Sequence, residues 1–257
     1  MKRKLDWLLK SKGVDIVFED EEILVLNKPA NLLVIPDRYD KSLPNVADIL
    51  KNELGKIFIV HGIDKETSGL IVFAKTAEAH AVLNGQLERR EVLKTYLAIV
   101  VGELSQKDGT IDLPLSEDSE GRTVKVDRKN GKESITEYTV LEQFAGYAFL
   151  GARPKTERMH QIRVHLRELA TPIFADGLYG NGTGFFLSHV KAGYKSDGEE
   201  KPLLSRTALH AAGMKFSHPS AQHIMEFEAE LPKDMRTVLK YLRKYRPGTQ
   251  ELKRISP

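Results

Sequence analysis

The residues of this chain with the clearest chemical potential lie between Val60 and Lys75, where one carboxylate stands in a polar turn between two apolar runs. Residues 57–60 and 70–74 are short, continuous and rich in branched side chains, which predicts two buried strands. Asp64 lies between them, and a carboxylate on such a scaffold can act as a nucleophile or a base. An aspartate in a turn also commonly accepts hydrogen bonds from backbone N–H groups, so the local pattern leaves both roles open.

A tyrosine lies on the next predicted strand, residues 93–101. A tyrosine on a strand usually packs into a core. In a reaction, Tyr96 would instead offer an aromatic face for stacking a base and a phenol that can exchange a proton.

A third segment, residues 152–167, carries five basic side chains against one acidic side chain. Apolar residues recur there at helical intervals, at Met159, Ile162, Leu166 and Leu169. His160, Arg163 and Arg167 would then share the opposite face of a helix. An arginine beside a buried carboxylate favours its ionised form, although a structural Asp–Arg pair is the ordinary alternative.

Together these three segments resemble the motifs of one family, the RluA-type RNA pseudouridine synthases. Residues 61–70, His-Gly-Ile-Asp-Lys-Glu-Thr-Ser-Gly-Leu, are similar to the family's His-Arg-Leu-Asp-x-x-Thr-Ser-Gly-Leu. Residues 94–102 are similar to its Lys-x-Tyr-x-Ala-x-Val-x-Gly segment, and residues 157–166 to its Gly-Arg-Thr-His-Gln-Ile-Arg-Val-His-Leu motif. Later stretches at 175–180 and 209–211 also resemble family signatures, and we interpret both as scaffold.

This chain differs from the family pattern at three of the matched positions. Gly62 stands where the family has the arginine that helps to fill the space left by the extruded nucleotide, and Glu157 and Met159 replace a glycine and a threonine.

The resemblance implies an α+β pseudouridine synthase fold, with a mixed, mostly antiparallel sheet, flanking helices and a central catalytic cleft. It implies that Asp64 initiates cleavage of the glycosidic bond, that Tyr96 stacks on the base, and that Arg163 orients and charge-balances Asp64. It implies no cofactor. The isolated His61 and the pair His160 and His165, five residues apart, lack the spacing of metal ligands, so we expect no metal ion. The expected substrate-binding residues are His61, Thr67, Arg158, His160 and Gln161.

Two other functions fit the same residues. One is an RNA-binding or RNA-folding protein that keeps the cleft but turns over little because of Gly62, Glu157 and Met159. The other is a glycosidase that uses Asp64 with Glu66 and releases free base or sugar.

Composition and charge agree with an RNA partner without identifying one. The net charge of the 257 residues is only +3, but residues 122–132 and 233–254 are strongly basic, as a polyphosphate partner requires. No apolar run approaches the roughly 20 residues that span a bilayer, so we expect no membrane partner. The chain has no cysteine, which fits the cytoplasm. We expect structured ribosomal or transfer RNA as partner and no DNA, and the sequence leaves the oligomeric state open.

The pattern along the chain indicates one catalytic domain, residues 15–257, after a short extension, residues 1–14, with no separate N-terminal RNA-binding domain. Residues 105–133 are polar and contain three glycines, which predicts a long excursion with hairpins, and residues 181–203 are predicted to be irregular. Further strands are expected at 16–18 and 23–26, and helices at 44–54, at 77–89 and from Asp234 onward.

Overall fold

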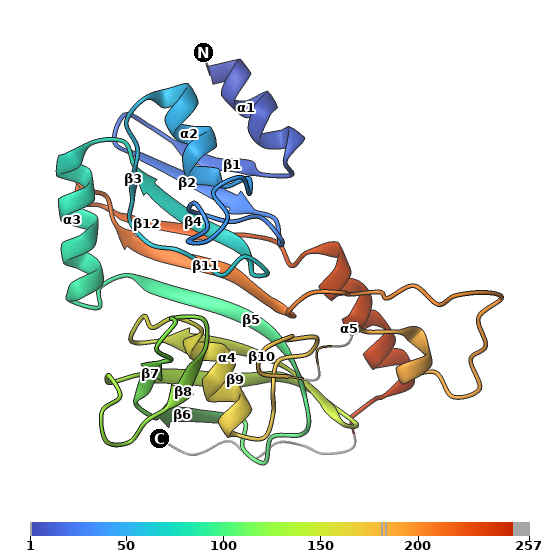
Figure 1. Cartoon of the computed structure of the whole chain (residues 1–257). Helices are drawn as coiled ribbons and strands as arrows, with labels where there is room; N and C mark the ends of the chain where they lie inside the picture. Colours follow the sequence, from blue (N-terminus) through green and yellow to red (C-terminus); the bar gives the residue numbers. More distant parts are fainter. Residues whose placement is uncertain (1, 181, 183, 249–257) are drawn as a thin grey trace. The chain divides into compact units, whose positions relative to one another are not determined.

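A computed structural model describes residues 2–180, 182 and 184–248 of the chain, without the side chains of residues 2 and 3. The chain divides into two compact units. The first unit comprises Met1–Lys94 and Ala211–Glu230, and the second comprises Thr95–His210 and Leu231–Pro257. Each unit has its own strands, helices and core, and each is described by itself (Figure 1).

The sheet of the first unit has the strand order β1, β2, β4, β11, with β3 paired to β4 and β12 paired to β11. The pairs β1–β2, β2–β4, β3–β4 and β11–β12 are antiparallel. The bounds are β1 Asp15–Glu19, β2 Ile23–Lys28, β3 Phe58–Ile59, β4 Ser68–Ala74, β11 Leu209–Ser217 and β12 Ile224–Glu228. The helices are α1 Lys2–Ser11, α2 Val46–Leu54 and α3 Ala77–Glu88.

Successive side chains of β2 and β4 point to opposite faces, and helices cover both faces, so these two strands are buried on both sides. Leu24, Leu26, Ile71 and Phe73 pack with buried residues of α1 and α2. Ile23, Val25, Leu70 and Val72 pack with buried residues of α3. Figure 1 shows α1 and α2 together on one side of β1 and β2. The strand that follows Asp64 is therefore buried along its whole length, and it is a rigid support for the turn before it.

The expected N-terminal extension contributes to this core. Leu5 and Leu9 of α1 are 2% and 0% exposed and lie in the same cluster as Leu24 and Phe73. The proposed division into residues 1–14 and a single catalytic domain stays a prediction.

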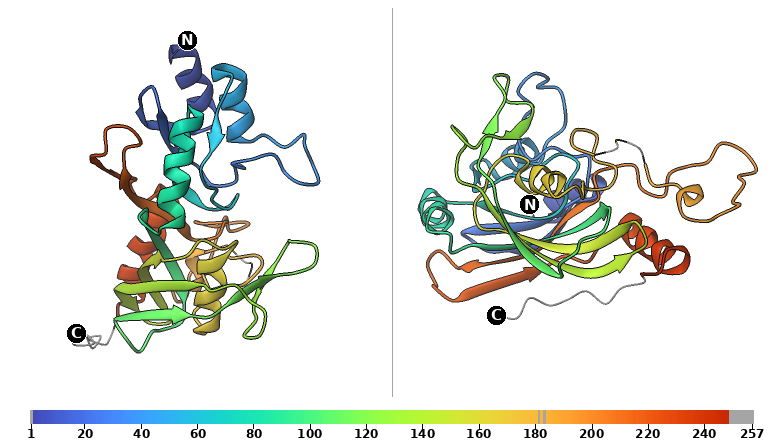
Figure 2. Two further views of the ribbon diagram at one scale, coloured as in Figure 1. Left: turned by 90° about the vertical axis from the view of Figure 1, so that its left-hand side faces the viewer. Right: turned by 90° about the horizontal axis from the view of Figure 1, so that it is seen from below.

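The second unit is built on an antiparallel sheet in the order β5, β10, β9, β6, beside a separate hairpin, β7–β8. The strands are β5 Leu93–Val101, β6 Asp108–Asp112, β7 Leu115–Glu117, β8 Val124–Val126, β9 Ile135–Phe144 and β10 Tyr147–Pro154. The helices are α4 Gln161–Glu168, α5 Lys233–Tyr245 and the short 3-10 helix η1 Leu187–His189. Figure 2 shows α4 and α5 on opposite sides of these strands.

Two apolar clusters hold the second unit. The larger one joins β5, β9 and β10 to α4 and to the buried residues of α5, which are Met235, Val238, Leu239 and Leu242. The smaller one places the hairpin β7–β8 on α4, through Leu115, Val124, Val164 and Tyr179. The second cluster matters for function because it links the hairpin to the helix that carries Arg163.

Most of the predicted elements are present, with two corrections. The predicted buried strand at 57–60 is only the two residues of β3, and Ile59 is 40% exposed, because β3 pairs with β4 on one side at the end of that strand. The predicted helix from Met159 begins at Gln161, since His160 has a left-handed backbone with φ 54°. Of the irregular stretch 181–203, residues 181 and 183 lie outside the described residues. Within the described ranges, no helix is both long and apolar enough to cross a membrane.

Candidate active site

Asp64 stands at the head of a tight turn that leads directly into β4. The backbone N–H of Thr67 donates a 3.1 Å hydrogen bond to the carbonyl oxygen of Asp64, which closes the turn. Asp64 is half-buried, whereas Thr67 and Ser68 are 1% and 4% exposed. The turn is thus anchored on its β4 side, and Asp64, at its start, is partly exposed to solvent.

A buried lysine holds the other side of this turn. Lys28, at the end of β2, is 0% exposed, and its Nζ donates hydrogen bonds to the carbonyl oxygens of Leu32 at 2.8 Å, Pro29 at 2.8 Å and Lys65 at 3.2 Å. A buried ammonium needs such partners, because an unsatisfied charge inside a protein is costly. Sequence analysis missed this role; the available signal was a lysine that ends an apolar strand.

Glycine is the only residue type that fits position 69, the second residue of β4. The φ of Gly69 is 115°, and a Cβ there would collide with the backbone carbonyl of Ala211 on β11. The glycine in the family motif therefore permits the close approach of two strands beside the turn.

His61 and Thr67, two predicted substrate-binding residues, are buried within the first unit. His61 is 8% exposed, and its Nε2 accepts a 3.4 Å hydrogen bond from the N–H of Val72. Burial, and then the charge of Lys94, lowers the pKa of His61 well below its usual value, so the ring is neutral at pH 7. The contact that the structure gives His61 is with β4, and its contact with substrate stays a prediction.

Gly62 lies in open space. The residue is exposed, its φ is not positive, and a Cβ at this position would have no neighbouring atom within 4 Å. An arginine side chain could therefore be accommodated here without moving the backbone.

In the second unit, Arg163 forms a two-point ion pair with Asp176. Its Nε and Nη2 donate hydrogen bonds of 2.7 and 2.8 Å to the two carboxylate oxygens, and the side chains are 4% and 0% exposed. Burial alone would raise the pKa of Asp176, but the hydrogen bonds and charge of Arg163, with the N–H groups of Leu178 and Tyr179, lower it. Asp176 is therefore ionised and fixes the guanidinium plane.

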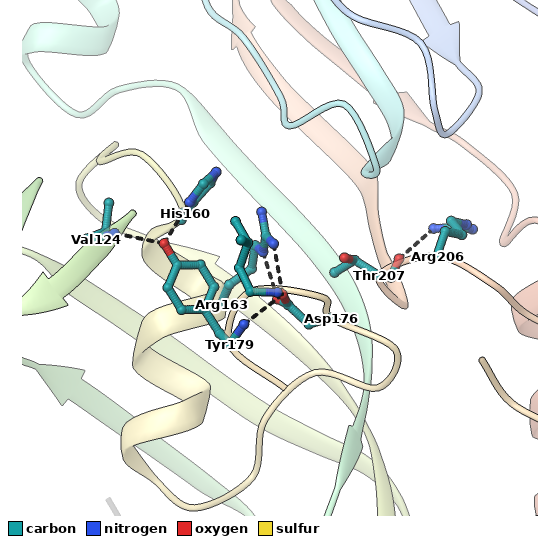
Figure 3. Close-up of polar contacts among 8 residues, drawn as sticks. Val124, His160, Arg163, Asp176, Tyr179, Arg206 and Thr207 are labelled. Carbon is teal, nitrogen blue, oxygen red and sulfur yellow. Dashed lines mark hydrogen bonds and ion pairs between the residues drawn. The ribbon is translucent and has the colours of Figure 1, made fainter. Parts of the chain in front are cut away.

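The side chain of Tyr179 contacts three of the residues that were expected on one helix face. The guanidinium carbons of Arg163 and Arg167 lie 5.1 and 5.5 Å from the centre of its ring. Its hydroxyl lies 2.8 Å from Nδ1 of His160 and accepts a 2.8 Å hydrogen bond from the N–H of Val124. Figure 3 shows His160, Arg163 and Asp176 around this tyrosine. Arg163 and Arg167 contact its ring from α4, as the predicted helix face requires, whereas His160 precedes the helix and reaches the same tyrosine from a left-handed backbone.

Gln161, a predicted substrate-binding residue, is 4% exposed and fully engaged inside the protein. Its amide oxygen accepts from the hydroxyl of Thr156 and the N–H of Arg158, and its amide nitrogen donates to Ile135 and Thr136. Two of these bonds tie the start of α4 to β9 and two tie it to the segment before the helix, which is a structural role.

Three predicted residues are more accessible. Tyr96 is half-buried on β5, opposite Ala152 in the register, and packs against the larger core cluster. Arg158 is exposed, and its Nε donates a 3.2 Å hydrogen bond to the carbonyl of Glu133. His160 is half-buried, and its left-handed backbone is uncommon for a residue other than glycine and costs about 1 kcal/mol or more.

Among the predicted site residues, the structure brings Arg163 and His160 together with Asp176 and Tyr179, which sequence analysis had assigned to the scaffold. Asp64 belongs to the first unit and Tyr96 and Arg163 belong to the second, so their convergence stays a prediction. Within the part of the chain that is described, no group of three or more His, Cys, Asp or Glu side chains has the arrangement of a metal site.

Comparison with known proteins decides the family. The RNA pseudouridylate synthase family profile matches residues 22–168, which include Asp64, Tyr96 and Arg163. The chain belongs to the RNA pseudouridylate synthase family. It is 35% identical over 249 residues to the uncharacterized RNA pseudouridine synthase YlyB of Bacillus subtilis, covering 93% of this chain and 76% of that protein.

The expected RluA-type membership of this pseudouridine synthase is also confirmed. It is 36% identical over 248 residues to ribosomal large subunit pseudouridine synthase D of Pseudomonas aeruginosa, covering 94% of this chain and 75% of that protein. The chain is therefore an enzyme, an isomerase that modifies RNA.

Solved structures confirm the expected α+β pseudouridine synthase fold. Human RNA Pseudouridylate Synthase Domain Containing 4 aligns with a TM-score of 0.70 at 23% identity, over 95% of this chain and 98% of that chain. Human RNA Pseudouridylate Synthase Domain Containing 1 aligns with a TM-score of 0.64 at 22% identity, over 93% and 98%.

Proposed function

We propose that this pseudouridine synthase isomerises uridines in structured ribosomal or transfer RNA, and that Asp64 initiates the cleavage of the glycosidic bond. The observation that carries the proposal is the position of Asp64. It is the half-exposed carboxylate at the head of a turn that β4 and Lys28 hold from two sides, in the motif by which the family is recognised.

The reaction breaks the bond between C1′ and N1 of uridine and forms a bond between C1′ and C5, while the proton on C5 leaves and N1 gains one. No atom is added, so no external cofactor is needed. The side chain of Asp64 could attack C1′ or the base, or remove the 2′ proton to give a glycal, and all three routes require the carboxylate.

The other two catalytic roles follow the same proposal. Tyr96 stacks on the uracil and exchanges the C5 proton, and Arg163 orients Asp64. The pair with Asp176 uses two of the five N–H donors of the Arg163 guanidinium and holds its plane for this purpose.

We propose that the five predicted substrate-binding residues divide into two groups. Arg158 and His160, which are exposed and half-buried, contact RNA. His61, Thr67 and Gln161 are buried and act by shaping the two segments that carry Asp64 and Arg163.

Structured RNA is the proposed substrate because the target uridine must leave its stack, and a loop lowers that cost from the few kcal/mol of a regular helix. The name of the Pseudomonas relative refers to the large ribosomal subunit, which supports ribosomal RNA as the substrate. A cytoplasmic location and a single catalytic domain at 15–257 belong to the same proposal.

Tritium release from RNA that contains 5-tritiated uridine tests this proposal, because the C5 hydrogen leaves only when C5 becomes bonded to C1′. We expect release by the unaltered enzyme and none by Asp64→Ala or by the isosteric Asp64→Asn. Glu66→Gln, two residues away in the same turn, is the matched control and retains release.

The alternatives give different products in the same experiment. Equal release by Asp64→Ala and the unaltered enzyme would contradict the role of Asp64. Free base or sugar, together with loss of activity in Glu66→Gln, would indicate a glycosidase, whereas tight RNA binding without release would indicate an RNA-binding protein.

A further inference from the structure

A hollow of about 260 Å³ lies between the hairpin β7–β8 and the start of α4, within the second unit. We call it the hairpin hollow. Its lining residues are Leu115, Ser116, Glu117, Val124, Asn130, Lys132, Arg158 and Met159. It is slightly smaller than the pockets of roughly 300 Å³ and more that hold drug-sized ligands, so its size suits a single nucleobase with its sugar.

Hydrogen bonds within the protein hold the hairpin that forms one wall of the hollow. Asp118 accepts hydrogen bonds from the backbone N–H groups of Arg122 and Thr123 and so closes the turn between the two strands. Leu115 and Lys132 exchange two backbone hydrogen bonds of 2.9 and 2.8 Å. The wall therefore does not need a ligand to take its shape.

The lining has two kinds of surface. Leu115, Val124 and Met159 supply apolar walls, and a methionine thioether makes favourable contacts with aromatic rings. Asn130 offers an amide that can pair with the edge of a base. The cations of Lys132 and Arg158 exceed the single carboxylate of the lining, which gives the hollow a net positive charge.

The surroundings are mixed in charge. The hairpin and the loop after it carry four further cations, Arg122, Lys125, Arg128 and Lys129, against the four carboxylates of Asp118, Glu120, Asp127 and Glu133, and Arg122 pairs with Glu120 at 3.2 Å. The charge that favours an anionic ligand is therefore that of Lys132 and Arg158 in the lining itself, because cations on one surface attract phosphate.

The hollow is connected to the residues around Arg163. Val124 lines the hollow, and its backbone N–H donates to the hydroxyl of Tyr179, on which Arg163 and His160 pack. Met159, on the other wall, is the residue before His160 and replaces the threonine of the family motif. A ligand here would touch both segments that fix Tyr179.

We propose that the hairpin hollow binds a second nucleotide of the RNA, distinct from the target uridine. Its base packs on the apolar surface that Met159, Leu115 and Val124 share, and Lys132 and Arg158 hold its phosphate. The choice of RNA as ligand rests on the proposed function, but the binding does not require turnover.

The absence of cysteine from the chain gives a direct test. Ser116→Cys places one thiol in the hollow, and Ile224→Cys, at a residue that is 58% exposed, places one on β12, outside the hollow lining. Both are made in Asp64→Asn, and reaction with methyl methanethiosulfonate is timed with and without unmodified large-subunit ribosomal RNA. At about ten times its Kd, RNA should slow Ser116→Cys about tenfold, since only the free fraction reacts, and leave Ile224→Cys unchanged.

A second measurement uses the walls themselves. Met159→Trp fills the hollow and should weaken RNA binding roughly tenfold, the effect of losing one stacked base, while Met159→Leu retains affinity. Lys132→Ala, an exposed change outside the core, should also weaken binding.

The nucleotide site would be overturned if RNA left the reactivity of Ser116→Cys unchanged and if Met159→Trp and Met159→Leu bound RNA equally well. That result would not affect the tritium-release test of the proposed function. Protection of Ser116→Cys without any tritium release by the unaltered enzyme would support the site and reject the proposed function.

Discussion

Arg163 and Asp176 are joined by two hydrogen bonds of 2.7 and 2.8 Å between side chains that are 4% and 0% exposed. The carboxylate also accepts the N–H groups of Leu178 and Tyr179, at 2.9 and 3.0 Å. Its lowered pKa means that the ion pair persists at neutral and mildly acidic pH, and that its contribution to stability is lost only as the pH falls below the unfolded value near 3.9. The pair therefore fixes Arg163 at neutral and mildly acidic pH.

Replacing Asp176 by asparagine should lower the free energy of unfolding by about 3–5 kcal/mol, because a buried guanidinium loses its counterion. Urea unfolding at pH 7 measures the change. Asp234→Asn is the matched control: Asp234 makes a similar two-point pair with Arg206, but it is 32% exposed, so its loss should be smaller. Equal losses in the free energy of unfolding would contradict the conclusion that burial makes the Arg163–Asp176 pair the more important of the two.

The buried histidines should make stability depend on pH. The pKa of His61 is lowered by burial and then by Lys94, and that of His165 is lowered by burial, so below about 6.5 the unfolded chain binds protons that the folded chain does not. Their contribution is complete above pH 6.5 and is lost as the pH falls toward the folded values. His61→Gln should flatten the loss of stability between pH 7 and 5.5, by up to about 1.4 kcal/mol per pH unit. A His61→Gln variant that keeps the slope of the unaltered protein would refute the assignment.

Lys28 should affect turnover through the turn of Asp64. Lys28→Met keeps the volume of the stem but removes the hydrogen bonds to Pro29, Leu32 and Lys65, so we expect a loss of about 1–3 kcal/mol in stability for the carbonyls left without a donor. We also expect a lower single-turnover rate of tritium release with unchanged RNA affinity. Lys75→Met, which breaks the pair with Glu19 in the same unit, should reduce stability without slowing the reaction. If tritium release slowed equally in both variants, Lys28 would contribute to stability only and would have no separate effect on the turn of Asp64.

Local signals predicted the elements better than the contacts between them. β2 and β4 follow from short apolar runs, because a strand buried on both faces has no alternation to read. The run at 57–60 has the same composition, yet β3 is short and partly exposed, since pairing with the end of β4 decides its extent.

The partners of the site residues could not be predicted in the same way. Arg163 and Asp176 are 13 positions apart on different segments, so only tertiary packing brings them together. Lys28 and Gln161 belong to residue types that are usually exposed, and they are buried because backbone carbonyls and hydroxyls satisfy them. A motif could suggest that Gln161 binds substrate, but its four internal bonds are visible only in the fold.

Gly62 offers a prediction about base extrusion. The position is exposed, a Cβ added to it would meet no atom within 4 Å, and its backbone is ordinary, so Gly62→Arg should fold with unchanged stability and place a cation beside the turn of Asp64. An arginine there can occupy the space of an extruded nucleotide, which matters most when the uridine is paired, because extrusion from a helix costs a few kcal/mol. We expect Gly62→Arg to speed tritium release about tenfold from a paired uridine, equal to about 1.4 kcal/mol, and to leave a loop uridine unaffected. Gly62→Ala, which adds no cation, should match the unaltered enzyme on both RNAs, and a slower Gly62→Arg would mean that another side chain already fills that space.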